Sequence, residues 1–191
     1  PLYSSAASDV YKRQIESKLK SFLRRGQLSV TSELENALSQ SDIVVMTLTA
    51  KIDGQNHPEY LEVENACKRI GKSLQQSSLF IYGGIAGLGF TEGVIKETLE
   101  NTSGLRVGDD FGLVYSPIQL FEDQLLASIY GRELKIAAMD KASLESAANV
   151  LGAVTGKGVK PILNVKTAEA AFLFSIAKQD ANLALANELA V

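Results

Sequence analysis

The chain has 191 residues, 46% apolar and 21% charged, with a net charge of -3, which is the composition of an ordinary soluble globular protein. Its Lys and Arg residues form no basic stripe, which argues against a nucleic-acid partner. The longest charge-free apolar stretch, Leu79 to Phe90, is too short and too glycine-rich to span a membrane, and a single cysteine, Cys67, excludes a disulfide framework and a zinc cluster and favours a cytoplasmic setting.

Residues 1–14 have no sustained apolar period and no signal-peptide core. They resemble the translated adaptor sequence found at the ends of metagenomic reading frames. We therefore treat them as a non-native leader and expect the folded domain to span residues 15–164.

Short runs of β-branched and aromatic residues alternate with longer stretches of helical spacing through that domain. The predicted strands are Leu28–Thr31, Ile43–Leu48, Ser78–Tyr82, Phe111–Tyr115, Leu134–Ala138 and Val159–Asn164. The predicted helices are Ile15–Arg25, Ser32–Gln40, Glu59–Leu74, Thr91–Asn101, Phe121–Tyr130 and Ser143–Val154. This alternation predicts a doubly wound, Rossmann-like α/β fold whose parallel sheet is incomplete at the N-terminus. Its central strands, the second to the fourth, should be neighbours buried on both faces.

Thr167–Val191 reads as one long helix without Gly or Pro. Its apolar residues surround the axis, so we expect the helix to be covered on most sides. No stop signal follows Leu189, which leads us to expect that the helix continues and that part of its partner surface is missing.

Ligands of such a sheet bind at the carboxyl ends of the strands, in the loops Thr47–Ala50, Gly83–Gly89 and Tyr115–Gln119. The middle loop, GGIAGLG, stands where a phosphate cradle would, since a helix follows it. It does not match GxGxxG. Two interpretations stay open: a phosphate-contacting loop, or a tight turn that lets the helix pack closely on the sheet.

Other chemically capable residues have plainer explanations. His57 reads as a solvated loop residue, and Asp109 and Asp110 as solvated turn residues, because nothing positions a second acid or base beside them. Cys67 reads as a small buried apolar residue. No metal site and no catalytic residue are predicted.

Several stretches together resemble the nucleotide-sugar dehydrogenase family, the UDP-glucose, GDP-mannose and UDP-N-acetylmannosamine 6-dehydrogenases. The terminal helix, TAEAAFLFSIAKQDANLALANELA, is similar to the helix that links the family's cofactor and central domains, which implies that residues 165–191 begin the central domain. DIVVMTLTA is similar to its strand ending in Val-Pro-Thr-Pro, with Thr49 in register, and VYSPIQ to its Tyr-Ser-Pro-Glu-Arg. FIYGGIAGLGFTEGVI stands where the family has Glu-Ser-Thr-Val-Pro-Pro-Gly-Thr-Thr.

The resemblance implies the site residues. Thr49, Gly84 and Ile85 would contact the cofactor NAD, and Tyr115 and Ser116 the nucleotide-sugar substrate. The helix over residues 167–191 would form a homodimer in the full-length protein.

Departures from the family pattern fall on these same loops and on the helix. The family's Glu-Ser-Thr becomes Gly83, Gly84 and Ile85, which removes a hydroxyl that faces the cofactor. The family's Lys and Asn, which face the reacting sugar, become Phe172 and Ile176, an apolar pair on one helical face.

A further departure is at Ile118 and Gln119, which replace the family's Glu-Arg. The family's glycine loop would precede Ile15, and its nucleophilic Cys would follow Val191.

The resemblance implies a fragment of an NAD-dependent nucleotide-sugar 6-dehydrogenase. Such enzymes oxidise a sugar C6 alcohol to a carboxylate, through a Cys-bound thiohemiacetal and thioester, for surface polysaccharide or glycan precursor synthesis. Two alternatives stay open. One is a catalytically degenerate paralogue that serves as a nucleotide-binding or assembly subunit, and the other is an unrelated α/β binding domain.

Overall fold

The structure is a computed structural model that describes residues 15–118 and 130–189. The chain divides after Leu34 into two units, which we treat separately. In the first unit, residues 15–24 form the predicted helix, which ends at Gly26 in a left-handed conformation (φ 67°). The predicted strand Leu28–Thr31 is wrong: these residues are exposed and have no strand partner among the described residues.

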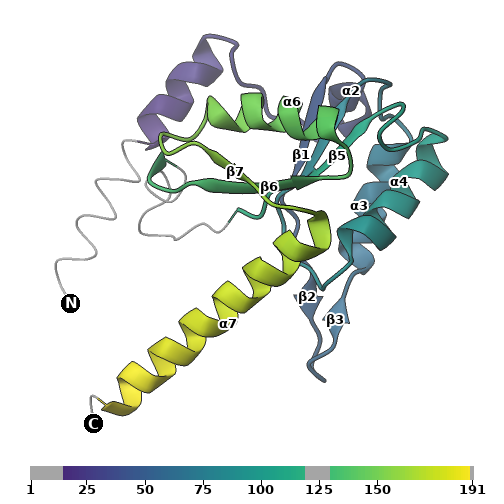
Figure 1. The fold of residues 1–191 in the computed structure, drawn as a ribbon. Coiled ribbons are helices and arrows are strands. Elements are labelled where there is room, and N and C mark those ends of the chain that lie inside the picture. Colours follow the sequence, from purple (N-terminus) through teal and green to yellow (C-terminus); the bar gives the residue numbers. More distant parts are fainter. Residues whose placement is uncertain (1–14, 119–129, 190–191) are drawn as a thin grey trace. The chain divides into compact units, whose positions relative to one another are not determined.

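The second unit is an α/β domain around a five-stranded sheet (Figure 1). From residue 34 onward the described elements are α2 (Leu34–Leu38), β1 (Ile43–Met46), β2 (Lys51–Ile52), β3 (Pro58–Glu59), α3 (Leu61–Gly71), β4 (Leu79–Tyr82), the π-helix η1 (Thr91–Ile95), α4 (Lys96–Ser103), β5 (Gly112–Tyr115), β6 (Leu134–Ala138), α6 (Lys141–Gly152), β7 (Val159–Pro161) and α7 (Val165–Leu189). The helix predicted at Phe121–Tyr130 lies almost wholly outside the described residues.

The strand order is β1-β4-β5-β6-β7, and β1, β4 and β5 are parallel neighbours, as predicted. The prediction of an all-parallel sheet is wrong at one pairing, because β6 runs antiparallel to β5 while β7 runs parallel to β6. The local sequence sets where a strand lies and not its direction, which depends on the path of the connection. The sheet is therefore mixed and mostly parallel.

Alternation along the central strands divides the core into two layers. Ile81, Val114 and Ile136 face α6 and pack with its Ala147 and Leu151. The register pairs Phe80↔Leu113 and Tyr82↔Tyr115 point to the opposite face, and all four residues are buried. α6 lies along one face of the sheet, and α3 and α4 lie along the other (Figure 1).

β1 is less buried than predicted. Ile43 is 41% exposed and Val45 is 49% exposed. Among the described residues β1 is an edge strand with β4 as its one strand neighbour, so it is packed in the sheet on one side only. The β-branched run correctly predicted the strand, but its burial on both faces is wrong for this chain.

Two local features have no clear signal in the sequence. Residues 51–59 form a small antiparallel hairpin, β2 and β3, around Asn56 (φ 62°). The predicted helix Thr91–Asn101 begins instead as the π turn η1, in which Ile95 N–H donates to Phe90 C=O at 3.1 Å, before α4 continues to Gly104. A π turn is rare and often lies at a functional position.

α7 confirms the long terminal helix, starting two residues before the predicted Thr167. Its first turns are buried at Val165, Ala168, Glu169 and Phe172 and contact β5, β6 and η1. Residues 177–189 are exposed, so the expectation that the helix is covered on most sides is wrong within this chain. No helix among the described residues has the length and apolar character that crossing a bilayer requires.

Ile136 offers a test of this core. It is fully buried in the layer under α6, so Ile136→Ala should lower the free energy of unfolding by about 2–5 kcal/mol. The control, Ile52→Ala, removes the same atoms at a position 71% exposed and should change stability by less than about 0.5 kcal/mol. Urea denaturation followed by circular dichroism measures both. Equal losses would contradict this assignment of the core.

Candidate functional site

The loops after β1, β4 and β5 meet at one edge of the sheet and are joined by backbone hydrogen bonds. Ala50 N–H donates to Ile85 C=O at 2.8 Å, and Ile118 N–H donates to Gly83 C=O at 3.0 Å. Ser116 N–H donates to Tyr82 C=O at 2.9 Å. The loops predicted to carry a ligand site are therefore brought together, up to Ile118, where the described segment ends.

The three predicted cofactor residues lie side by side. Ile85 N–H donates to the Thr49 hydroxyl at 3.4 Å, and Thr49 is exposed while Ile85 is half-buried. Gly84 is buried between them: a Cβ added there would lie 2.0 Å from the Leu48 carbonyl oxygen and 2.7 Å from the Tyr82 hydroxyl oxygen. Thr49 and Ile85 can thus face a ligand, and Gly84 is required by the close approach of two chain segments.

The two predicted substrate residues are buried. Tyr115 is 1% exposed and its ring lies 5.9 Å from that of Tyr82 in a tilted arrangement, while Ser116 is fully buried. Burial raises the pKa of both phenols above the ordinary value, and the nearby Glu169 carboxylate raises them further. Both tyrosines therefore stay neutral at physiological pH, and neither Tyr115 nor Ser116 presents a surface to a ligand in this chain.

Glu169 is the polar residue of this region that the sequence did not single out as functional. It lies on α7 and is 1% exposed, yet it has no ion-pair partner among the described residues. One carboxylate oxygen accepts a hydrogen bond from Gly89 N–H at 2.6 Å, and the other accepts one from Thr91 N–H at 2.9 Å. A search for polar residues inside an apolar helical stretch would have found it, but not its partners.

This contact favours one of the two interpretations of GGIAGLG. The N–H groups at the start of the following helix, where a phosphate would bind, already donate to the Glu169 carboxylate. Gly87 lies close to Tyr60, because a Cβ added to Gly87 would be 2.5 Å from the Tyr60 hydroxyl oxygen. Gly89 has a left-handed backbone conformation, with a φ of 79°. The geometry supports a tight turn with close packing.

The substituted positions form mostly buried surface. Phe172 is 8% exposed and Ile176 is half-buried. Ile118 packs on Gly83, with its Cδ1 atom 3.1 Å from where a Cβ would stand. The described positions at which this chain replaces polar residues of the resembled family are therefore apolar and mostly buried, and Gln119 lies outside the described residues.

The plainer explanations of the remaining residues fit the structure. The His57 side chain is 72% exposed, and Asp110 accepts hydrogen bonds from Gln76 and from Arg106 N–H within its own turn. Cys67 is 1% exposed, and burial, with a smaller effect from Glu64, raises the pKa of its thiol to about 12, so it is not a nucleophile in the folded chain. Within the described ranges no cluster of His, Cys, Asp and Glu could hold a metal ion.

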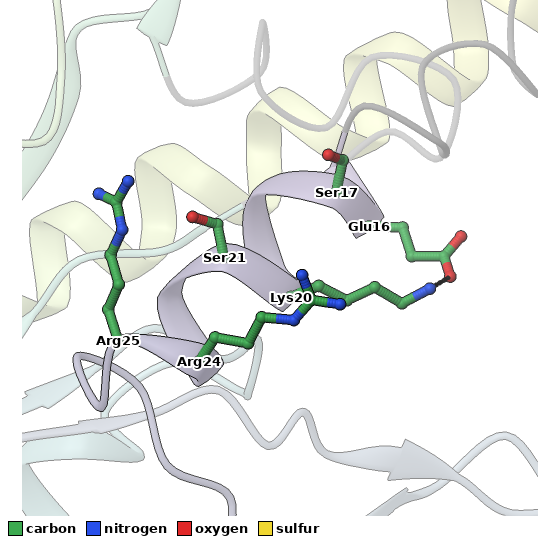
Figure 2. Close-up of a pocket in the computed structure, with 6 residues that line it drawn as sticks. All are labelled: Glu16, Ser17, Lys20, Ser21, Arg24 and Arg25. Carbon is green, nitrogen blue, oxygen red and sulfur yellow. Dashed lines mark hydrogen bonds and ion pairs between the residues drawn. The ribbon is translucent and has the colours of Figure 1, made fainter.

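A polar surface hollow in the described part of the first unit lies wholly on the helix over residues 15–24 and its end. Figure 2 shows its six lining residues along that helix, with the Lys20 ammonium 2.5 Å from the Glu16 carboxylate. The lining residues are Glu16, Ser17, Lys20, Ser21, Arg24 and Arg25. Because no second described element contributes a residue, we treat this hollow as an exposed helix face and not as a binding site.

Comparison with known proteins agrees with the loop geometry. Residues 3–151 match the UDP-glucose/GDP-mannose dehydrogenase family, NAD binding domain. The chain belongs to this family. The resemblance drawn from the loops and the terminal helix is thus confirmed, and NAD is the cofactor of the matching domain. The divisions predicted near residues 14 and 164 stay predictions.

Curated relatives include Protein CapL of Staphylococcus aureus, 30% identical over 169 residues, covering 88% of this chain and 40% of CapL. A UDP-N-acetyl-D-mannosamine dehydrogenase of Pyrococcus horikoshii is 27% identical over 191 residues, covering 98% of this chain and 44% of that protein. The chain thus spans less than half the length of these relatives.

Solved structures show the same fold. UDP-D-ManNAc dehydrogenase from Pyrococcus horikoshii matches with a TM-score of 0.85 at 25% identity, covering 92% of this chain and 41% of that one. GDP-mannose dehydrogenase from Pseudomonas aeruginosa, solved as a ternary complex, matches with a TM-score of 0.83 at 20% identity, covering 91% of this chain and 40% of that one.

The described residues fit NAD in part. Thr49 and Ile85 can form a wall beside it. They offer no free backbone N–H groups to its pyrophosphate at the start of the helix, because Gly89 N–H and Thr91 N–H already donate to the Glu169 carboxylate. A family member would have to hold the phosphates with other residues.

The glycine turn yields a direct prediction. Gly84→Ala should destabilise the chain by about 1–3 kcal/mol or more, because the new methyl would overlap the Leu48 carbonyl. Gly93→Ala is the control: no atom lies within 4 Å of its added Cβ, and a helical Gly-to-Ala change should be neutral or stabilise by up to about 1 kcal/mol. Thermal and urea denaturation compare the two variants. A tolerated Gly84→Ala would mean that the loops after β1 and β4 are not in contact.

Proposed function

We propose that this chain is the part of an NAD-dependent nucleotide-sugar 6-dehydrogenase that contains the later strands of the cofactor domain and the beginning of the central helix. The observation that carries the proposal is the family match over residues 3–151. The meeting of the loops after β1, β4 and β5 at one edge of the sheet supports it, since ligands of such sheets bind there. The reaction class is oxidation of a sugar C6 alcohol to a carboxylate for surface polysaccharide or glycan precursor synthesis.

In this proposal NAD supplies the hydride acceptor, and the residues of this chain position the reactants. The exposed Thr49 and the half-buried Ile85 border the cofactor, while the closely packed Gly84 fixes the distance between their loops. Buried Tyr82 and Tyr115 pack against each other at the ends of β4 and β5, with their ring centroids 5.9 Å apart. The described residues supply neither nucleophile nor general base, so the chemistry would need groups from the rest of a full-length protein.

A second candidate is a catalytically degenerate paralogue that acts as a nucleotide-binding or assembly subunit. Phe172 favours it. Where the family has a cationic side chain facing the sugar, Phe172 is 8% exposed, and an apolar buried residue cannot stabilise developing negative charge. Buried Tyr115 and Ser116 favour it as well.

We also propose a homodimer through residues 167–191. Leu185 and Leu189 lie four residues apart on one face of α7 and are 59% and 79% exposed, and a second copy could cover this apolar surface. The edge strand β1, which has β4 as its one strand neighbour among the described residues, could pair with further strands of the cofactor domain. A cytoplasmic location, inferred from the single cysteine, completes the proposal.

The first functional prediction concerns the chain alone. It should bind NAD weakly or not at all and turn over no nucleotide sugar, because the amides at the glycine turn are already bonded to Glu169. Isothermal titration with NAD, and absorbance at 340 nm during incubation with UDP-N-acetylmannosamine or UDP-glucose, measure the two properties. Micromolar NAD affinity would contradict the prediction. A longer protein that carries this chain and reduces NAD with a nucleotide sugar would support the enzyme, and one that only binds would favour the paralogue.

Phe172 separates the two candidates. If its surroundings form a packed apolar seam, Phe172→Lys buries an uncompensated ammonium and should lower stability by several kcal/mol. Ile176→Asn, at a half-buried position, should cost less. The matched control is Phe174→Lys, because Phe174 is 75% exposed on the same helix and should tolerate a charge within about 0.5 kcal/mol. Urea denaturation ranks the three variants. Equal stability of Phe172→Lys and Phe174→Lys would point to an open, wet cleft and hence to the enzyme.

A further inference from the structure

The contact between Glu169 and the glycine turn joins segments 80 residues apart in the chain. Both carboxylate oxygens are used, one by Gly89 N–H at 2.6 Å and one by Thr91 N–H at 2.9 Å. The first N–H groups of a helix have no partner within the helix and carry partial positive charge. A carboxylate from another helix therefore satisfies them and is itself stabilised while buried.

A second contact joins the same two segments. The Lys166 ammonium, on the first turn of α7, lies 3.4 Å from the Glu92 carboxylate in η1. This pair is partly exposed and so contributes little by itself. It shows, however, that the first turn of α7 and the start of η1 face each other at two places. Buried Val165 and Ala168 flank the contact on α7.

We propose that Glu169 is a positioning residue that locks the turn Gly83–Thr91 to α7. The turn contains Gly84 and Ile85 of the candidate cofactor wall, and Phe172 follows Glu169 by three residues, nearly one helical turn. Glu169 thus makes the cofactor side and the sugar side of the site one rigid body. The consequence for catalysis rests on the proposed function, but the lock itself does not.

Such a lock is needed because the turn holds itself weakly. Four of its nine residues are glycine, which gives the unfolded turn a large conformational freedom. The π turn that follows replaces the ordinary helical hydrogen-bond pattern at its start. Fixing Gly89 and Thr91 from outside restricts the turn at its junction with the helix.

The test is amide hydrogen exchange, read residue by residue by NMR in this chain. Glu169→Gln keeps the size of the side chain but replaces one acceptor oxygen by an NH₂ donor, which cannot accept from an amide. The remaining oxygen can still accept from one amide, so we expect exchange to accelerate at least ten-fold at Gly89 or Thr91, whichever loses its acceptor. Exchange at Gly104, whose N–H is bonded to Glu100 C=O in the same helix, should stay unchanged. The control Glu188→Gln removes an exposed carboxylate from α7 and should change none of these rates.

Two outcomes would overturn the proposal: unchanged exchange at Gly89 and Thr91, or an equal acceleration at every core amide, which would indicate a loss of global stability only. If Glu169→Gln does not fold, the parent chain supplies the test. At low denaturant, Gly89, Thr91 and Ala168, the last bonded to Asn164 C=O, should open together with one denaturant dependence. Independent opening would contradict the lock.

A kinetic measurement in a longer, active protein tests the catalytic consequence. There Glu169→Gln should raise the KM for NAD more than it lowers kcat, because it loosens the wall of the site without touching a reacting atom. A parent without dehydrogenase activity would overturn the proposed function and leave the exchange result standing. A Glu169→Gln variant with faster exchange but unaltered kinetics would limit the lock to the fold and overturn its positioning role.

Discussion

The architecture of this edge of the sheet depends on one buried carboxylate. Placing an ionised carboxyl group in a protein interior costs several kcal/mol unless it is compensated, and Glu169 has no cation within ion-pair distance among the described residues. Two N–H groups at a helix start compensate it, each worth about 1.5–3 kcal/mol as a hydrogen bond to a charged group. The N–H groups at the helix start stabilise the buried carboxylate, and the carboxylate in turn restricts the glycine turn.

This interaction determines how the candidate site can use its parts. Helix N-termini after parallel strands are ordinary anion sites, but here the protein supplies the anion itself. The loop after β4 is left to act by shape, through the close approach of Gly84 to Leu48 and the positions of the exposed Thr49 and the half-buried Ile85. The chain therefore has the fold of an NAD-binding domain, while the amides of Gly89 and Thr91 at its glycine turn are bonded to its own carboxylate.

The sequence predicted what local chemistry encodes. The β-branched and aromatic runs correctly predicted β1, β4 and β5 as parallel neighbours, and the Ala- and Leu-rich run predicted α7. The antiparallel pairing of β6 and the exposure of β1 depend on which strands come together over long distances, which no short window contains. Among the site residues, the proximity of Thr49, Gly84 and Ile85 followed from the rule that parallel strands end at one edge. The partners of Glu169 lie about 80 residues away and donate through backbone N–H groups. Every residue except proline carries such a group, so the amino-acid types at these positions did not indicate the contact.

The same geometry explains how the fold can persist where the polar site has changed. Phe172 stands one turn beyond Glu169, at the position where the resembled family has a lysine. If Glu169 depended on that lysine for charge compensation, its replacement by Phe172 would leave a buried carboxylate unpaired and destabilise α7. Both oxygens of Glu169 are instead bonded to Gly89 and Thr91, so its burial is independent of residue 172. The contact of Glu169 with the glycine turn is therefore independent of the residue at position 172. A polar side chain at position 172 can be lost while that contact is kept.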